Sequence, residues 1–107
     1  MQPHVKPVGC EKLESKVRVE LVTPESILGM AEVLTYGANK YEANSWQNIK
    51  TPVETHYGAL LRHLLAWRGG EHLDSESGYS HMKHVLTNAM FLLHHEENAL
   101  SVLEKKE

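Results

Sequence analysis

Apolar residues recur at three- and four-residue spacing in three stretches of the chain, and this periodicity predicts three helices. The first begins after Thr23, a favourable N-cap, with Pro24 at the first helical position, and runs to about residue 41. The second covers about residues 54–68 and ends at a pair of glycines. The third starts near Ser80. This pattern predicts an all-α fold, a compact domain of about three to four helices.

The pattern also divides the chain into three parts. Residues 1–15 lack periodicity and predict an extended N-terminal arm. Residues 16–95 form the expected domain, at whose start Val17, Val19 and Leu21 alternate with charged residues, which favours a short extended segment. Such a segment has no strand partner in its own chain, so we expect it to pair across subunits or to lie over the helices. Residues 96–107 are polar and predict a helical C-terminal extension.

The third predicted helix carries two stripes of different chemistry. Its apolar face consists of Met82, Val85, Leu86, Ala89 and Leu93. Beside it run His81, His84, Asn88 and His95, at positions i, i+3, i+7 and i+14. The two stripes cover most of the helix and leave as the solvated strip Lys83, Thr87 and His94. We therefore predict that the polar stripe is at least partly buried.

Histidines and carboxylates gather where the second and third predicted helices meet. His56 and His63 lie two turns apart on the second helix, and the loop after it carries Glu71, Asp74 and Glu76. Imidazoles and carboxylates at such a corner are the ligand types that bind divalent metal ions, and the carboxylates suit Mg²⁺ or Mn²⁺. The same histidines have a structural alternative, in which they cap helices or line a polar seam, because no closed motif such as HExxH is present.

Two further positions have both a functional and a structural interpretation. Glu32 is the carboxylate of the first helix that can reach an inward site, and it can equally be an exposed helical residue. The loop residues Asn44, Ser45 and Trp46 offer an amide, a hydroxyl and an indole, which suit stacking a base and hydrogen-bonding its edge or a phosphate. Trp46 can instead be a hydrophobic plug that closes the core.

Composition narrows the class of protein. A domain of 107 residues is small, so we expect a polar site to be completed at a subunit interface of a homo-oligomer, a dimer or larger. The net charge of −3 lacks the basic excess of proteins that bind duplex nucleic acid. The single cysteine, Cys10, cannot form an internal disulfide and fits a reducing, cytoplasmic compartment. No segment has the ~20 apolar residues of a membrane span, and the N-terminus lacks a signal-peptide core.

Two runs of sequence are specific in combination. AEVLTYGANKYEANSW at residues 31–46 and HYGALLRHLLAWRGGEHLDSESGYSHMKHVLTNAMFLL at residues 56–93 closely resemble the small phage-encoded family of dATP/dGTP diphosphohydrolase domains. The resemblance covers about residues 12–95. It implies an all-α fold, cleavage of a purine deoxynucleoside triphosphate to monophosphate and pyrophosphate, and a divalent metal ion, Mg²⁺ or Mn²⁺. It also implies action in the host cytoplasm if the chain is phage-encoded.

The resemblance extends only in part to the MazG-type pyrophosphohydrolases, which bind Mg²⁺ through an ExxE on one helix and an ExxD on the next. Glu71-His72-Leu73-Asp74 matches ExxD, but residues 16–95 contain no ExxE. Histidines would therefore have to replace the missing carboxylates, and the candidates are His63, His81 and His84. On this basis the expected metal ligands are Glu71, Asp74, His81 and His84, and the expected catalytic residues are His63, Glu71 and Asp74.

The resemblance also suggests how a nucleotide binds. In the family a basic segment lies just ahead of the first helix, which makes Lys16 and Arg18 expected phosphate contacts, although they can equally be solvated charges. Arg62 is expected to clamp the phosphates. The expected nucleotide-binding residues are Lys16, Arg18, Glu32, Asn44, Trp46, Arg62 and Asn88. The leading hypothesis is metal-dependent hydrolysis between the α and β phosphates of a purine deoxynucleoside triphosphate. The alternatives are a non-catalytic sponge that sequesters a host signalling nucleotide between subunits, and a purely structural oligomerisation module.

Overall fold

The computed structural model describes residues 16–106, and the arm expected over residues 1–15 lies outside this part. Helix α2 spans Pro24–Lys40, α3 spans Pro52–Arg68 and α4 spans His81–Lys106. Within the described residues there is no strand, only one isolated β-bridge in the loop before α4. The all-α prediction is therefore confirmed. The expected C-terminal extension is helical, because α4 continues through it without a break.

The start of the domain differs from the prediction. The segment that the alternation predicted to be extended forms a 3₁₀ turn, η1 (Val19–Leu21). The Leu21 amide donates to the Arg18 carbonyl at 3.2 Å and closes this turn. The prediction is wrong because alternation alone does not hold a strand extended: a strand needs a neighbour to satisfy its backbone, and residues 16–106 contain none.

Prolines start the first two α-helices. Thr23 has the extended backbone of an N-cap, with φ −68° and ψ 143°, and Pro24 follows at the first helical position, as predicted. Helix α3 starts in the same way at Pro52, slightly before the predicted boundary. It ends at Arg68, and the amide of Gly69 closes its last turn, so the predicted glycine stop is confirmed.

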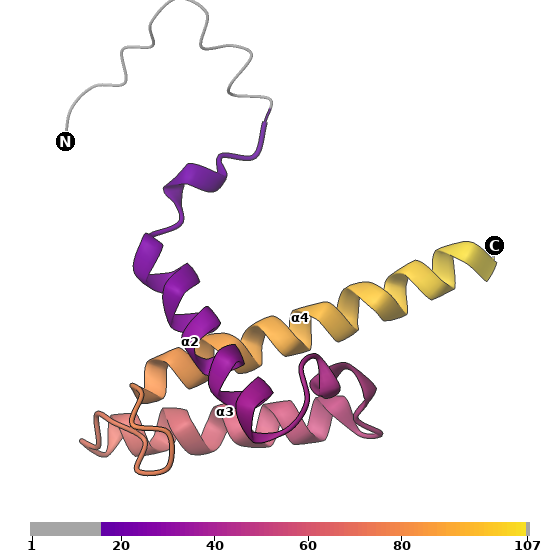
Figure 1. Cartoon of the computed structure of the whole chain (residues 1–107). Helices are drawn as coiled ribbons and strands as arrows, with labels where there is room; N and C mark the ends of the chain where they lie inside the picture. The colour runs from indigo at the N-terminus through magenta and orange to yellow at the C-terminus, as the bar shows by residue number, and fades with distance from the viewer. Residues whose placement is uncertain (1–15, 107) are drawn as a thin grey trace, which may run out of the picture.

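Helices α3 and α4 form an antiparallel hairpin, and α2 crosses it (Figure 1). Helix α4 packs against both other helices and is the central element of the domain. The loop at residues 69–80 folds back on itself, since the Asp74 amide donates to the Tyr79 carbonyl at 2.8 Å. This fold brings the carboxylates of Glu71 and Asp74 beside the first turn of α4. None of the helices in residues 16–106 combines the length and apolar character needed to cross a membrane.

The interior is polar along α4. His81, His84 and Asn88 are buried, which confirms the predicted burial of the polar stripe. Thr87 is 0% exposed, so its predicted place in the solvated strip is wrong, and Lys83 of the same strip is half-buried. The Thr87 hydroxyl donates to the Lys83 carbonyl one turn back at 2.7 Å. Because this bond satisfies the hydroxyl within the helix, a threonine can pack inside the domain.

The apolar faces that the periodicity predicts as core remain largely exposed in the described chain. On α2 the buried positions are Gly29 and Val33, whereas Ile27, expected in the core, is 54% exposed. On α4 Leu93 is also 54% exposed, and Leu86 is exposed as well. Periodicity identifies an apolar face but not the neighbour that covers it. These helices therefore keep apolar surface that no residue of the described chain covers.

Candidate metal centre and adjoining cavity

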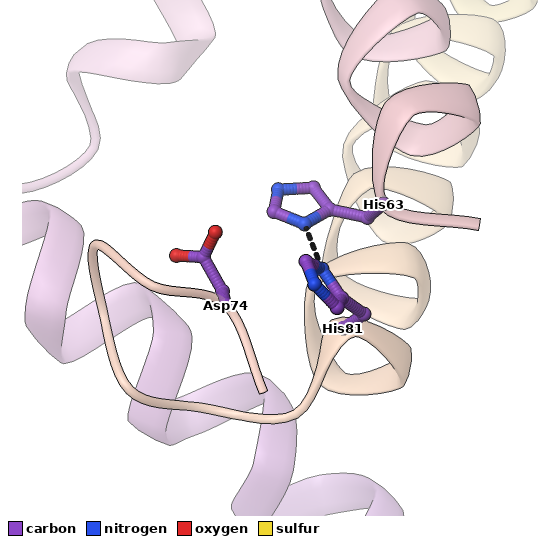
Figure 2. Close-up of side chains that lie close together, drawn as sticks. All are labelled: His63, Asp74 and His81. Carbon is purple, nitrogen blue, oxygen red and sulfur yellow. Dashed lines mark hydrogen bonds between the residues drawn. The ribbon is translucent and has the colours of Figure 1, made fainter. Parts of the chain in front are cut away.

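Three side chains from three parts of the chain converge at the corner between α3 and α4, and we call them the corner cluster (Figure 2). His63 comes from α3, Asp74 from the loop and His81 from the first turn of α4. One possible ligand atom of each residue lies within 4.8 Å of the other two. The Nδ1 atoms of His63 and His81 are 2.9 Å apart. One imidazole therefore donates to the other, and the acceptor ring is neutral.

His84 extends the corner cluster by one turn of α4. Its ring stacks on that of His63, with the centroids 4.2 Å apart and the planes 6° from parallel. Its Nε2 lies 2.7 Å from the Ser77 hydroxyl and 3.8 Å from Asp74 Oδ2. His84 therefore adjoins the cluster and shares the Asp74 carboxylate with it.

The local sequence holds the Asp74 carboxylate in place. Oδ2 accepts a hydrogen bond from the Ser77 amide at 2.8 Å, the pattern of an Asx turn. Gly78 follows in the left-handed region at φ 79°, and its amide donates to the Asp74 carbonyl at 2.8 Å. Glu76 accepts from the Tyr36 hydroxyl at 3.1 Å, which ties the loop to α2. Sequence reasoning missed Ser77, although Asp-x-x-Ser in a loop is a signal for such a turn.

Burial favours the neutral form of two imidazoles, those of His63 and His84. It lowers the pKa of His63, and the neighbouring His84 lowers that pKa further. Burial also lowers the pKa of His84, against the opposing attraction of Asp74. Burial alone would raise the pKa of Asp74, but hydrogen bonds from Ser77 and the nearby imidazoles hold it below its usual value. At neutral pH His63 and His84 are therefore neutral and Asp74 is ionised, the protonation states that metal binding requires.

The donor set fits a divalent ion. Two imidazole nitrogens and one carboxylate oxygen form a set that leaves coordination positions for water and substrate. His81 supports this fit, because its Nε2 is buried with no hydrogen-bond partner in the described chain. Mg²⁺ prefers an all-oxygen set, whereas imidazole nitrogens suit transition ions. Of the two ions expected from the sequence, Mn²⁺ therefore fits these residues better.

Glu71, expected as a ligand together with Asp74, lies outside the corner cluster. Its side chain is exposed, and its Oε1 is 3.4 Å from His81 Nε2 without the geometry of a hydrogen bond. The ExxD spacing brings two carboxylates together only on a helix, where positions i and i+3 share a face, and residues 71–74 form a loop.

A cavity of about 1120 Å³ adjoins the corner cluster. Its wall comes from α2, the segment at residues 41–49, α3 and α4, and it includes His63 and His84. The lining is mostly apolar with a few polar groups, which is the composition of small-molecule sites. Three of the expected nucleotide-binding residues line it: Asn44, Trp46 and Asn88.

The other four expected nucleotide contacts do not line the cavity. Lys16 and Arg18 are exposed in the segment before α2, and Arg62 is exposed on α3. Glu32 pairs with Lys83 at 2.7 Å. The predictions for these residues rest on their charge and, for Lys16 and Arg18, on the place of a basic segment in the family, and neither signal tells which surface a side chain faces.

A second group of histidines has no counterpart among the expected site residues. His56 is 3% exposed, lines the cavity and stacks on His95 with the ring centroids 5.5 Å apart. Trp46 and Phe91 pack against His56, and we call these four residues the aromatic cluster. His94, predicted to be solvated, is half-buried with its ring 4.9 Å from that of Trp46. The sequence signal for this cluster is the periodic spacing of histidines, two turns between His56 and His63 on α3 and i, i+14 between His81 and His95 on α4.

The sequence matches a known family over most of its length. The family described as "dATP/dGTP diphosphohydrolase, N-terminal" matches residues 8–104. A dATP/dGTP diphosphohydrolase of Salmonella phage PMBT28 is 30% identical over 79 residues, which are 74% of this chain and 27% of that protein. The chain thus spans about a quarter of the length of this relative. No solved structure matches.

Proposed function

This chain belongs to the dATP/dGTP diphosphohydrolase N-terminal family, and from that premise we propose that it hydrolyses dATP or dGTP to the monophosphate and pyrophosphate with a divalent metal ion. The observation that carries the proposal is that a cavity of nucleotide size borders the corner cluster, at His63 of the cluster and at the adjoining His84. A nucleoside in this cavity would have its phosphate chain beside the cluster. We expect the protein to act where deoxynucleotides are found, in the cytoplasm, and this is the cytoplasm of the host if the chain is phage-encoded.

In this proposal His63, Asp74 and His81 would hold a divalent ion, and its positive charge would make the α phosphorus more electrophilic. A water oxygen forms a bond to the α phosphorus, the bond from this phosphorus to the α–β bridging oxygen breaks, and pyrophosphate leaves. His84 lines the cavity and is neutral, so its Nε2 can accept the proton that the water loses once the water takes the place of the Ser77 hydroxyl, which lies 2.7 Å from this atom. Asp74 Oδ2, 3.8 Å away, then stabilises the imidazolium.

A non-catalytic nucleotide sponge is the second candidate, and one observation favours it. The corner cluster contains a single carboxylate, Asp74. One carboxylate and two imidazoles can hold one ion, which is enough to bind a phosphate chain without activating water. Such a protein would sequester a host signalling nucleotide between subunits.

Product analysis separates the two candidates. Purified protein is incubated with dATP, dGTP, dCTP and ATP in the presence of Mn²⁺ or Mg²⁺, then denatured, and the supernatant is chromatographed. Monophosphate plus pyrophosphate identifies the hydrolase, whereas intact nucleotide that is released only by denaturation identifies the sponge. Chelation with EDTA abolishes function in either case, and added Mn²⁺ restores it. Full function in the chelated sample would remove the metal ion from the proposal.

We further propose that a second copy of the chain covers the exposed face of α4. This face carries residues at alternating spacings of four and three, the heptad repeat of a helix that pairs with another helix: Met82, Leu86, Ala89, Leu93, Glu96, Leu100 and Leu103. The last turns of α4 extend past α2 and α3, so no helix of the described chain covers them (Figure 1). Two α4 helices related by a twofold axis would bury this face on itself.

A further inference from the structure

The aromatic cluster has more hydrogen-bonding capacity than its contents use. The indole of Trp46 stacks on Phe91, with the ring centroids 4.3 Å apart and the planes 26° from parallel. The same indole meets the rings of His56 and His95 edge to face. The Nε2 atoms of both histidines are buried, and neither has a hydrogen-bond partner in the described chain. Proteins rarely leave a buried polar atom unpaired, so two such nitrogens around one slot call for a ligand that can pair with them.

His56 is the better placed of the two for recognition. It lines the cavity, while His95 stacks behind it with the ring planes 17° from parallel. Burial, helped by the neighbouring His95, lowers the pKa of His56, and the nearby Trp46 carbonyl and Asn88 side chain only partly oppose this. A neutral imidazole has one nitrogen that donates and one that accepts, and exchange of tautomers reverses these roles.

The indole that covers Phe91 lies on a short connection. Trp46 belongs to η2 (Ser45–Asn48), a single 3₁₀ turn that contains no buried residue. It is preceded by Asn44 in the left-handed region at φ 64°. Apart from the ring contacts of Trp46, this turn buries no side chain and therefore opens at low free energy, whereas Phe91 and His56 are held on α-helices. Movement of the turn would therefore leave a flat apolar slot on Phe91, within the cavity that the corner cluster also borders.

We propose that this slot binds the purine base, that the Trp46 indole fills it when no nucleotide is bound, and that His56 Nε2 recognises the base. The inference rests on the proposed function. A purine is a planar fused bicycle like indole, so it fits on the face of Phe91. Unlike indole, its edge carries several hydrogen-bonding groups. One tautomer of His56 accepts from the 6-amino group of adenine and the other donates to the 6-oxo group of guanine, which accounts for a site that takes both bases.

Base analogues test the inference on the unaltered protein. dATP, dGTP and the triphosphate of purine deoxyriboside, which has hydrogen at position 6, are compared by kcat/KM with Mn²⁺, or by Kd if no turnover occurs. For the analogue without a 6-substituent we expect kcat/KM, or the affinity, to be lower by about 10- to 100-fold, because this analogue leaves the His56 nitrogen unpaired. Equal values for all three nucleotides would overturn the inference. No binding and no turnover with any nucleotide would overturn the proposed function itself.

Two substitutions of His56 separate hydrogen bonding from packing. His56→Phe keeps a ring but removes both nitrogens, whereas the amide of His56→Gln can still donate or accept. We expect His56→Phe to lower kcat/KM for dATP and dGTP, or to raise their Kd, by about 10- to 100-fold, and to leave the value for the unsubstituted purine nucleotide unchanged. In His56→Gln most of this loss is expected to be absent. If His56 had only a structural role, its substitution would lower kcat/KM or affinity for all three nucleotides alike, and this result would contradict the inference.

Trp46→Ala tests whether the indole occupies the slot. If it does, the base no longer has to displace a ring, and purine nucleotides bind at least as tightly as to the unaltered protein. If Trp46 were instead a platform on which the base stacks, its loss would weaken binding, and the indole would not be the occupant of the base site.

Discussion

The corner cluster and the aromatic cluster use the same residue type for different chemistry. Each pairs a histidine of α3 with a histidine of α4 whose Nε2 is buried, His63 with His81 in one case and His56 with His95 in the other. In the corner cluster a loop adds the carboxylate of Asp74, which makes a donor set for a cation. In the aromatic cluster the added side chains are an indole and a phenyl ring, which make a slot for a flat polar ring.

The difference lies in the connections, because both clusters stand on the same two helices. The loop at residues 69–80 supplies the corner cluster, and the segment at residues 41–49 supplies the aromatic cluster. The helix pattern decides that the histidines are inside. The connecting segments decide what each histidine can bind.

Asp74→Asn is expected to produce the largest effect, and to change the corner cluster without changing the aromatic cluster. The amide oxygen of Asn can still accept from the Ser77 amide, so the turn is kept, but the negative charge is lost. We expect turnover to fall by at least about 100-fold and Mn²⁺ affinity to fall with it. Kinetics and titration calorimetry measure both.

The matched control for this variant is Glu76→Gln, which removes a carboxylate from the same loop outside the corner cluster. Because the Glu76 pair with Lys40 is exposed, we expect turnover to stay near that of the unaltered protein and the melting temperature to change little. Equal losses in the two variants would mean that loop charge in general, and not a ligand at Asp74, supports function.

Leu93→Glu tests whether the two clusters need a second subunit. Light scattering of the unaltered chain is expected to give at least twice 12.1 kDa, and Leu93→Glu is expected to reduce this to the single-chain mass. Asn98→Glu adds the same charge to α4 outside the heptad positions and should leave the mass unchanged. A single-chain mass for the unaltered protein at micromolar concentration, with full function, would contradict the proposed assembly.

Acidification is expected to lower the stability of the folded chain through histidines of both clusters, and added Mn²⁺ distinguishes the two contributions. Burial lowers the pKa of His56, His63 and His84, so below their ordinary value of 6.5 the unfolded chain binds protons that the folded chain does not. Stability is therefore complete above this pH and is lost as the pH falls from it towards the folded-state pKa values. The melting temperature is expected to be lower at about pH 5.5 than at about pH 7.5. A constant melting temperature would contradict the burial of neutral imidazoles.

Saturating Mn²⁺ should raise the melting temperature at the higher pH and lose this effect on acidification, because protonated imidazoles release the ion. His56→Phe should reduce the pH dependence of the ion-free protein while leaving the Mn²⁺ effect intact. If His56→Phe also removed the Mn²⁺ effect, the two clusters would not be chemically separate.

Ser77→Ala is expected to produce the smallest effect. It removes the hydroxyl beside His84 Nε2 but keeps the backbone amide that holds Asp74. We expect a loss of about 10-fold in turnover and about 0.5–1.5 kcal/mol in the free energy of unfolding. A loss as large as that of Asp74→Asn would show that the hydroxyl itself, and not only the carboxylate, is essential.

Local signals in the sequence were sufficient for the helices and for the family. Thr23 and Pro24 fix the start of α2, and the glycines after Arg68 fix the end of α3, because capping depends on a few adjacent residues. The predicted family is confirmed by the match over residues 8–104. The burial of His81 and His84 followed from the width of the two stripes on α4.

Features that depend on contacts between distant parts of the chain could not be predicted from the sequence. The helix pattern predicts that Thr87 is solvated, but the residue is buried, because periodicity cannot show which face of α4 is covered by α2 and α3. Glu71 was paired with Asp74 by a spacing that has meaning on a helix, but the residues lie in a loop. The approach of Trp46 to His56 and His95 depends on how the segment before α3 folds back, which no spacing within one helix encodes.

The central claim is that the corner cluster holds a metal ion beside the nucleotide cavity, and pulsed electron paramagnetic resonance of bound Mn²⁺ tests it most directly. Nitrogen couplings report imidazole ligands, and phosphorus couplings report a bound nucleotide. We predict nitrogen couplings that weaken in His81→Ala, and phosphorus couplings that appear when dATP is added. Mn²⁺ that shows phosphorus couplings without any from nitrogen would place the ion on the nucleotide alone and contradict the account.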